Sequence, residues 1–419
     1  MLTRLPETFS QTPQGREAEA ILRNCVHCGF CNATCPTYQL RGDELDGPRG
    51  RIYLIKDMLE GDAVSDRTRR HLDRCLTCLS CETTCPSGVR YGQLLEIGRH
   101  ELERRLPRPL GQRLLRHGLR ALLTRPRLLG SLLPLGRRLR AVFPAALRGY
   151  LRPAPPIPPW PPWPAARADR LRRVILLEGC AQAALRPDLN AWTARLLDRL
   201  GIAVLRAPRS GCCGALSHHL DAVEEARRLM RANIDAWWPL LEQEGAEAIV
   251  SNASACSLML KDYRRLLADD PAYRDKAAHI ASRARDLSEL LATADLAPLR
   301  SRLNTRTIAF HAPCTLQHGL KLATRTEDIL RRCGLRLLPV RDPHLCCGAA
   351  GTYSLLQPAL SRRLRENKLA ALTREGPECI ATANIGCLLH LQGGTDLPVK
   401  HWLELLAEEQ DQEPRHRPD

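Results

Sequence analysis

The chain has 419 residues, enough for two or three domains with cores of their own. Its formal net charge is +16, but aromatic residues make up only 4% of it and no nucleic-acid-binding motif accompanies the charge, so nucleic acid is not an expected partner. Charged and polar residues are spread through the first 20 residues, so no apolar signal-peptide core is expected there, and no apolar run reaches the roughly 18 residues of a membrane span. We therefore expect a cytoplasmic protein, in which the 18 cysteines stay reduced.

Two cysteine motifs with the same spacing dominate the first hundred residues. A predicted helix over residues 16–24 leads into the first motif, C-x2-C-x2-C-x3-C-P. A turn then opens an amphipathic run over residues 47–60, and a second predicted helix, over about 65–74, leads into the second motif. The cysteines of the first motif are Cys25, Cys28, Cys31 and Cys35, and those of the second are Cys75, Cys78, Cys81 and Cys85.

This spacing is typical of paired [4Fe-4S] clusters. Three closely spaced thiolates can hold three irons of one cubane cluster, while the fourth ligates the other cluster of the pair. The prediction is therefore one cluster on Cys25, Cys28, Cys31 and Cys85, and a second on Cys75, Cys78, Cys81 and Cys35. Structural zinc would need two separated cysteine pairs, and disulfides would need secretion, so neither is favoured. Arg49, Arg51 and Arg74 would raise the cluster potentials if they lie close, but would have little effect from the surface.

A basic segment follows the second motif. Residues 101–152 contain thirteen arginines and two glutamates, with leucines between them in a broken helical rhythm. An apolar stripe with an arginine-rich face would suit an anionic membrane surface or a groove on a partner subunit. A solvated helical hairpin is the third interpretation. The next residues, 153–164, include eight prolines and predict an extended spacer between domains.

An internal repeat occupies the rest of the chain. Each copy begins with a buried strand leading to a cysteine, continues with a helix, a second strand and a Cys-Cys-Gly sequence, and ends with an apolar strand leading to a last cysteine. The offset is 134 residues for the first three cysteines and 131 for the last. The repeated cysteines are Cys180, Cys212, Cys213 and Cys256 in the first copy, and Cys314, Cys346, Cys347 and Cys387 in the second.

These patterns predict the fold class. We expect an α+β multidomain protein with an N-terminal α-helical ferredoxin domain and two repeated α/β units of mostly parallel strands, with the cysteines gathered at the carboxyl ends of the strands. The predicted divisions are a ferredoxin domain (1–100), a basic helical segment (101–152), a Pro-rich linker (153–169), a first repeat (170–300), a second repeat (301–405) and a polar tail (406–419).

Each repeat resembles the CCG module of the heterodisulfide reductase B family, whose full motif has the form C…CCG…C-x-x-C. In that family the motif is associated with a noncubane [4Fe-4S] cluster or with thiol chemistry. Ala253 and Asn384 stand where the first cysteine of the final C-x-x-C would be. The four remaining cysteines of each repeat are candidates for a further cluster or thiol site, and the alternative is a surface that binds a partner or faces a quinone.

Other cysteines and histidines of the repeats are interpreted as structural. Cys333 and Cys379 fall outside the repeated pattern and are expected to be buried packing thiols. Five histidines lie close in sequence to the repeated cysteines, and ordinary polar or core positions are favoured for them over proton transfer. These are His218, His219, His311, His318 and His344.

The whole combination resembles a family of electron-transfer subunits, and within it the iron-sulfur subunits of glycolate oxidase (glycolate dehydrogenase). The sequences that carry the resemblance include Cys-Val-His-Cys-Gly-Phe-Cys at 25–31, Gly-Asp-Glu-Leu-Asp-Gly-Pro-Arg-Gly-Arg at 42–51 and Thr-Ala-Asn-Ile-Gly-Cys at 382–387. The resemblance implies two [4Fe-4S] clusters here and FAD on partner glycolate oxidase subunits, which oxidise glycolate to glyoxylate. It also implies a membrane acceptor such as quinone, and peripheral contact with the inner face of the cytoplasmic membrane.

No catalytic residue is expected in this chain, because it lacks a Gly-rich dinucleotide fingerprint and the substrate pocket would lie on a partner. Three alternatives stay open at this point. The complex could oxidise lactate or glycerol-3-phosphate in place of glycolate. The repeats could form a heterodisulfide-reductase-like thiol-disulfide reductase, although the absent cysteines count against it. The chain could also be a metal-stabilised binding module without a redox role.

Overall fold

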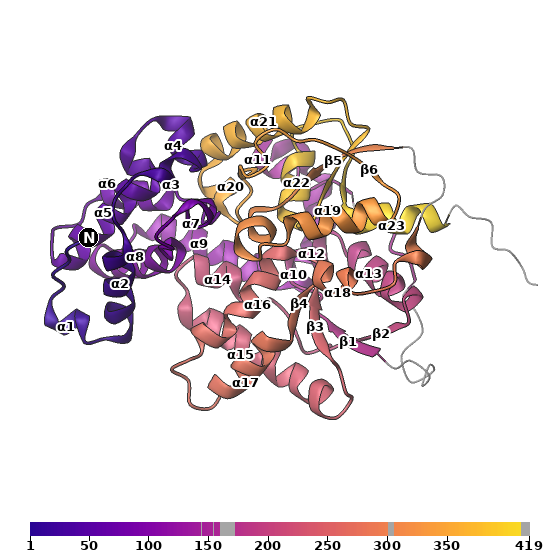
Figure 1. The fold of residues 1–419 in the computed structure, drawn as a ribbon, viewed down its shortest axis with the longest axis horizontal. Helices are drawn as coiled ribbons and strands as arrows, with labels where there is room; N and C mark the ends of the chain where they lie inside the picture. Colours follow the sequence, from indigo (N-terminus) through magenta and orange to yellow (C-terminus); the bar gives the residue numbers. More distant parts are fainter. Residues whose placement is uncertain (144, 154, 160–171, 301–305, 412–419) are drawn as a thin grey trace, which may run out of the picture.

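The computed structural model describes residues 1–143, 145–153, 155–159, 172–300 and 306–411. A helical domain at the N-terminus packs against the side of two α/β units, which lie one above the other in Figure 1. This is the α+β arrangement that the sequence predicts. Within the described ranges, no helix is both long enough and apolar enough to span a membrane.

Three longer helices form the frame of the helical domain. They are α2 (Pro13–Asn24), α5 (Pro48–Glu60) and α8 (Tyr91–Arg105). Proline opens both α2 and α5, where its missing N–H costs nothing, and Thr12 caps α2 by accepting a hydrogen bond from the Gly15 N–H. Shorter helices connect them: α1 (Glu7–Ser10), α3 (Phe30–Ala33), α4 (Pro36–Arg41), η1 (Glu44–Asp46), α6 (Asp66–Asp73) and α7 (Ser80–Thr84).

The two helices predicted here are confirmed as α2 and α6, and the amphipathic run over residues 47–60 forms α5. Their apolar faces, with residues such as Leu22, Ile55 and Leu72, enclose a core that also contains the first cysteine of each motif. Helix α8 continues across the predicted boundary between residues 100 and 101, because Glu101 and Leu102 on its last turns are still buried against the domain. The helical domain therefore extends to the end of α8.

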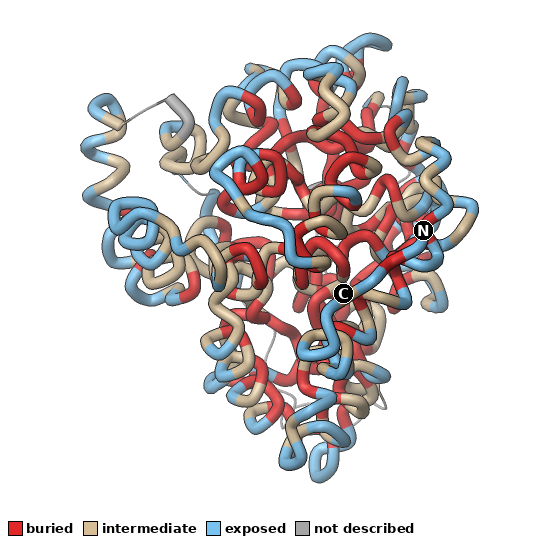
Figure 2. The backbone as a smooth tube through the Cα atoms, turned by 90° about the vertical axis from the view of Figure 1, so that its left-hand side faces the viewer, coloured by how far each residue is buried: buried red, intermediate tan, exposed pale blue. Residues whose placement is uncertain are grey.

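The basic segment forms helices that lie on the outside of the molecule. These are α9 (Leu110–Leu123), α10 (Pro126–Arg138), η2 (Arg140–Val142) and α11 (Ala145–Arg148). In Figure 2 the buried backbone is concentrated in the middle of the molecule and the outer helices are exposed or half-buried. Several arginines hold the segment to the body through ion pairs, with Arg108 2.7 Å from Asp73 and Arg120 3.3 Å from Glu225. Some arginines of the basic segment are therefore already paired with acidic residues of the same chain.

Each α/β unit has a four-stranded parallel sheet, with the orders β2-β1-β3-β4 and β6-β5-β7-β8. The strands of the first unit are β1 (Arg172–Leu176), β2 (Ile202–Leu205), β3 (Ala248–Ser251) and β4 (Ala284–Asp286). Those of the second are β5 (Thr307–His311), β6 (Arg336–Leu338), β7 (Cys379–Thr382) and β8 (Val399–His401). The predicted parallel repeat is confirmed, and each sheet has a fourth strand that the pattern did not reveal.

Helices cover the two sheets. In the first unit they are α12 (Ala181–Leu185), α13 (Asp188–Arg199), α14 (Ala215–His219), α15 (Val223–Glu242), α16 (Ser254–Leu266), α17 (Arg274–Arg283) and α18 (Leu287–Ala292), followed by η4 (Ala297–Leu299). In the second they are the π-helical turn η5 (Thr315–Gly319), α19 (Ala323–Arg332), α20 (Tyr353–Leu356), α21 (Pro358–Thr373), α22 (Ile385–Gln392) and α23 (Trp402–Asp411).

Two predicted boundaries differ from the observed elements. The final strands β3 and β7 end at Ser251 and Thr382, so the last cysteine of each repeat lies on the first turn of the following helix, α16 or α22. The tail predicted from residue 406 begins inside α23, because Leu406 and Ala407 are buried in the core. Most of the predicted Pro-rich linker, residues 154 and 160–169, lies outside the described residues.

The two α/β units share one core. Val174 of β1 and Phe310 of β5 belong to the same apolar cluster, which also contains Trp402 of α23. Cys333 and Cys379 lie in this cluster with 1% and 4% of their surface exposed, which confirms that they are buried in the core. Shared burial of this kind makes the pair of repeats one body.

Candidate metal centres

The first cysteine-lined cavity draws on both motifs. Its empty volume is about 430 Å³, part of it open to solvent. The fourth cysteine comes from the second motif, directly after α7, and the other three come from the first motif. These four are Cys25, Cys28, Cys31 and Cys85, and Cys81 also lines this cavity because it lies in the wall shared with the second one. Cys28 is exposed and Cys25 is buried, so the cavity lies at the edge of the domain.

The second cavity has the reverse composition, with one cysteine from the first motif and the others from the second. Its empty volume is about 300 Å³, and three of its cysteines belong to the second motif. The fourth, Cys35, comes from the first motif at the residue that precedes α4. The four are Cys35, Cys75, Cys78 and Cys81. The structure thus brings together, in each cavity, the cysteine set that the sequence analysis grouped.

The fourth cysteine of each motif lies in the cavity of the other motif, and a hydrogen bond joins the two motifs just before these cysteines. Thr34 and Thr84 occupy the same position in the two motifs, immediately before the fourth cysteine, and their Oγ1 atoms are 2.9 Å apart. Thr34 directly follows α3 and Thr84 ends α7, so these two short helices lie against each other. The residue after each threonine, Cys35 or Cys85, lines the cavity that holds the first three cysteines of the other motif.

Both ligand loops use the same unusual backbone. His27 and Gly29 in the first motif, and Thr77 and Leu79 in the second, have positive φ angles between 51° and 88°. Left-handed residues on either side of the second cysteine bend the loop tightly and turn successive N–H groups towards one side, as in anion-binding nests. For the β-branched Thr77 and for Leu79 this conformation costs about 1–2 kcal/mol each. Two loops with the same strain indicate a shared ligand requirement.

The donor sets fit an iron-sulfur cluster better than they fit an empty cavity. Burial raises the pKa of Cys31 to about 11 and holds the pKa of Cys81 well above its usual value. Such thiols stay protonated unless a cation stabilises the thiolate. Four sulfur donors around one cavity, with mainly apolar neighbours, match the ligand set of a [4Fe-4S] cluster. A thiol that is hard to ionise and is grouped with three others gains most from such a cation.

Arg51 is the buried charge of the second cavity. Its side chain is 1% exposed and lines the cavity, and its guanidinium donates to the Thr37 hydroxyl at 3.2 Å and to the His71 carbonyl at 2.8 Å. Although burial raises the pKa of Cys75, the positive Arg51 and Arg99 lower it below its usual value. The Tyr91 hydroxyl donates to the Cys75 sulfur at 3.5 Å. Arg51 also lies 3.7 Å from the buried Asp46, which Arg74 contacts at 2.9 Å. Arg49 lines the first cavity and is 35% exposed.

The repeated cysteines form one row of thiols in each α/β unit. Successive side chains are hydrogen-bonded, and these hydrogen bonds, together with burial, hold the pKa of most of these thiols well above its usual value. In the first unit the row is Cys180, Cys212, Cys213 and Cys256, and in the second it is Cys314, Cys346, Cys347 and Cys387. Both rows lie at the carboxyl ends of the central strands, where ligands bind in open α/β sheets.

The two positions that lack a cysteine meet at the interface between the repeats. The Ser254 N–H, next to Ala253, donates to the Ala383 carbonyl at 3.3 Å. The Asn384 amide donates to the Ser254 hydroxyl at 3.4 Å and accepts from the Gly386 N–H at 2.9 Å, which caps α22. These residues therefore join the two units, and Asn384 also closes a helix end.

The second thiol row adjoins the second cavity of the helical domain. Cys78 and Cys314 both pack against an apolar cluster that contains Cys346 and Tyr353. The Tyr353 hydroxyl donates to the Arg74 carbonyl at 3.1 Å, which ties the second repeat to the loop before Cys75. The first row makes no such approach among the contacts of the described residues. The two repeats are thus placed differently with respect to the helical domain.

Most of the histidines are structural, as expected. His318 bridges the domains, with Nδ1 3.1 Å from the Thr83 hydroxyl and Nε2 2.9 Å from the His344 carbonyl. His218 lies 3.2 Å from Glu96 of α8, and although burial raises the pKa of this glutamate, His218 and Arg265 lower it to about 2. These contacts dock the helical domain onto the two units.

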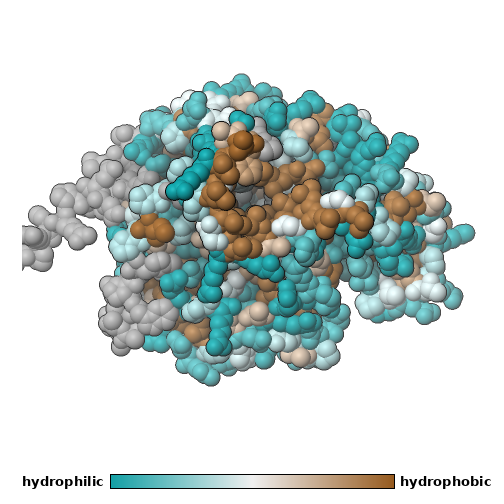
Figure 3. Space-filling view, turned by 180° about the vertical axis from the view of Figure 1, so that it is seen from behind, coloured by the Kyte–Doolittle hydropathy of each residue, from teal (hydrophilic) through white to brown (hydrophobic). Residues whose placement is uncertain are grey.

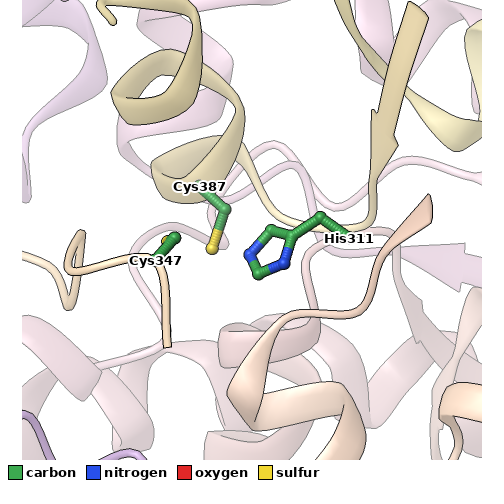
Figure 4. Close-up of side chains that lie close together, drawn as sticks. All are labelled: His311, Cys347 and Cys387. Carbon is green, nitrogen blue, oxygen red and sulfur yellow. The ribbon is translucent and has the colours of Figure 1, made fainter. Parts of the chain in front are cut away.

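His311 does not fit that interpretation. It ends β5 with 1% of its surface exposed, and neither ring nitrogen has a hydrogen-bond partner among the residues that the structure describes. Figure 4 shows its imidazole directed towards the sulfur of Cys387, with Cys347 on the neighbouring loop. Burial, together with the positive Lys368, holds the pKa of His311 well below its usual value, so the ring is neutral. An alignment of the two repeats could have revealed this position, because Leu177 occupies it in the first repeat.

Comparison with known proteins agrees with this architecture. The family described as "4Fe-4S dicluster domain" matches residues 21–89, and the family described as "Cysteine-rich domain" matches residues 174–261 and 308–392. The fold and these matches define an iron-sulfur protein that joins a dicluster domain to two cysteine-rich domains.

Relatives narrow the class further. The "Glycolate oxidase iron-sulfur subunit" of Escherichia coli (strain K12) is 51% identical over 420 residues, covering 99% of this chain and 100% of that protein. The "Probable glycolate oxidase iron-sulfur subunit" of Bacillus subtilis (strain 168) is 31% identical, covering 91% and 90%. "Lactate utilization protein A" of an Exiguobacterium species is 27% identical but covers only 56% of this chain. The chain belongs to the family of glycolate oxidase iron-sulfur subunits.

Proposed function

We propose that this chain is the electron-transfer subunit of a complex that oxidises glycolate to glyoxylate. The observation that carries the proposal is the pair of four-cysteine cavities, in a chain 51% identical over its length to a glycolate oxidase iron-sulfur subunit. We assign a [4Fe-4S] cluster to each cavity, with Cys25, Cys28, Cys31 and Cys85 as ligands of one and Cys75, Cys78, Cys81 and Cys35 as ligands of the other. Bound clusters supply one-electron transfer.

The residues of this chain position the ligands of the proposed clusters, bury the clusters and set the charge around them. The left-handed loops fix the first three cysteines of each motif, and the Thr34–Thr84 contact fixes the fourth. Arg51 places a buried positive charge beside the second site, which favours the reduced and more negative state. Oxidation of glycolate removes two electrons at once, so we assign that step to FAD on partner subunits.

A thiol-disulfide reductase is less well supported. Nucleophilic cysteines need a lowered pKa and access to substrate. Here burial and neighbouring thiols raise the pKa of Cys213 and Cys347 well above the usual value, and both side chains are buried. The rows of thiols are thus better suited to binding a metal or to packing than to attacking a disulfide.

The test of the function uses the anaerobic, natively co-purified complex. Addition of glycolate is expected to produce electron paramagnetic resonance signals of reduced clusters, while lactate and glycerol-3-phosphate added in parallel do not. Clusters that are reduced by dithionite but by none of the three substrates would contradict the glycolate assignment and keep the electron-transfer role. Reduction by lactate alone would mean that the complex oxidises lactate in place of glycolate.

We further propose that α9, α10 and η2 contact an anionic membrane surface on the way to a quinone acceptor. Figure 3 shows a large hydrophobic area on the face of the molecule seen from behind. The exposed apolar side chains of these elements are Leu110, Leu114, Leu115, Leu128, Leu132, Leu135, Leu139 and Val142. Arginines such as Arg113, Arg125 and Arg138 are exposed between them, which complements anionic headgroups. A soluble hairpin would not leave eight large apolar residues exposed.

Replacement of Leu114 and Leu135 together by serine is expected to weaken binding to vesicles of phosphatidylglycerol and phosphatidylcholine at least tenfold. Two buried leucines contribute about 2–4 kcal/mol, and 1.4 kcal/mol is a tenfold change. The measurement is co-sedimentation of the whole complex with the vesicles. Leu2→Ser is the matched control, because Leu2 is 80% exposed but lies in the helical domain. If the unaltered complex does not bind these vesicles, the surface belongs to a partner subunit.

A further inference from the structure

The second repeat contains an imidazole that has no partner in an otherwise thiol-lined site. His311 is buried, and within the described part of the chain neither of its ring nitrogens has a hydrogen bond. One ring nitrogen and the sulfurs of Cys347 and Cys387 all lie within 4.8 Å of one another. A buried polar ring without a partner costs free energy, so such groups nearly always bind something. Figure 4 shows the three side chains converging from a strand end, a loop and a helix.

We propose that His311, Cys347 and Cys387 bind a borderline-soft transition metal, iron or zinc, in the second repeat. Imidazole and thiolate together are ligands that both metals accept. Cys346 is hydrogen-bonded to Cys347 and is the next sulfur available to complete the coordination. The inference goes beyond the proposed function and holds whichever substrate the complex oxidises.

The first repeat provides an internal comparison. Leu177 occupies the position equivalent to His311 and packs in an apolar cluster with 2% of its surface exposed. The first row of thiols therefore has no imidazole at this position. If the ring of His311 were only a core side chain, an apolar residue would fill the same place at lower cost, as the first repeat shows. The difference between the copies points to a ligand that the second repeat alone holds in this way.

Neighbouring groups are consistent with an anionic metal–thiolate centre. Lys368 is 3% exposed, and its ammonium donates to the carbonyls of Asp342 and Pro343 at 3.2 and 3.0 Å. This buried positive charge acts on Cys346, Cys347 and Cys387, where thiolates would otherwise be uncompensated. Asn384 cannot supply the missing ligand, because its side chain is committed to capping α22. His311 lies at the end of β5 and supplies a nitrogen donor in place of the cysteine that the full motif has at position 384.

The test is metal analysis of the anaerobically purified complex, with three variants. His311→Leu installs the residue of the first repeat and is expected to lose at least one iron or zinc per chain, while the reduced-cluster signals of the N-terminal cavities persist. His311→Cys replaces one metal donor by another and is expected to retain the metal. Cys333→Ala, a buried cysteine outside the site, is the matched control and is expected to keep the full content.

X-ray absorption at the iron and zinc edges of the unaltered complex provides an independent readout. An imidazole scattering path at either edge supports the assignment and identifies the metal, and this path is expected to disappear in His311→Cys. Metal content that is unchanged in a folded His311→Leu variant would overturn the proposal. Absence of an imidazole path from both edges of the unaltered protein would overturn it as well, even if the leucine variant fails to fold.

Discussion

Cys85→Ser is expected to remove the same cluster signal as Cys28→Ser, whereas Cys35→Ser removes the other one. Cys85 lies in the second motif but lines the first cavity with Cys28, and Cys35 lies in the first motif but lines the second cavity. A serine hydroxyl is a poor iron ligand, and the loss of one of four thiolates destabilises the cluster. Each variant should reduce electron flow to the acceptor by at least 100-fold, about 3 kcal/mol or more in barrier terms.

The measurements are iron content, electron paramagnetic resonance of the reduced complex, and glycolate-dependent reduction of a quinone analogue. Bleaching by glycolate of the flavin that we propose on a partner subunit should remain intact in all three variants, because glycolate is expected to react there and not on this chain. Cys379→Ala is the control, since this cysteine is buried in the shared core away from both cavities. If Cys85→Ser and Cys75→Ser removed the same signal, each motif would serve its own cluster and the exchanged assignment would fail.

Arg51→Met is expected to lower the reduction potential of the second cluster by about 100 mV. A unit charge about 7 Å away, in an effective dielectric constant of about 20, contributes about 2 kcal/mol. For a one-electron couple this equals about 100 mV. Removal of the positive charge destabilises the reduced cluster more than the oxidised one, so the potential falls. A redox titration of the complex, followed by electron paramagnetic resonance, measures both clusters at once.

Two matched variants separate charge from packing. Arg51→Lys keeps the positive charge and is expected to recover most of the potential, although it loses the two-point contact with Thr37. Arg49→Gln is expected to shift the potential of the first cluster by much less, because the Arg49 side chain is 35% exposed to solvent whereas that of Arg51 is 1% exposed. Equal shifts for Arg51→Met and Arg49→Gln would mean that burial does not control the effect of these charges.

The short-range features of this protein could be predicted from the sequence. The C-x2-C-x2-C-x3-C-P spacing determines which cysteines share a loop, and the turn at residues 47–48 indicates where α5 begins. Helix α2 begins at Pro13, three residues before its predicted start. The repeat offset of 134 residues predicted two similar parallel sheets, because matching apolar strands recur with matching cysteines. Local chemistry and spacing are sufficient for such features.

Contacts between distant segments could not be predicted in the same way. Nothing in the sequence around Cys78 indicates that Cys314 lies nearby, since that contact depends on how a helical domain docks onto an α/β unit. The short edge strands β4 and β8 have three residues each and carry too little pattern to be recognised. His311 was grouped with ordinary core histidines because its unpaired nitrogens are a property of the folded site.

The position of Asn384 accounts for one of the two cysteines that are absent from the repeated motif. Its amide bonds across the boundary between the two α/β units and caps a helix. A thiol there could not make either hydrogen bond as well as an amide does. The structure gives no corresponding reason for alanine at position 253.

The two cavities of the helical domain share a wall made of Pro48, Cys81 and Tyr91. Centres separated by one layer of side chains are close enough for rapid electron tunnelling, and close enough to repel each other's added charge. The first electron to arrive makes the second harder to add. Reduction should thus be anticooperative, with a titration curve broader than that of two independent carriers. Such a pair releases one electron at a time, and the difference between the two cluster environments determines which cluster is oxidised first.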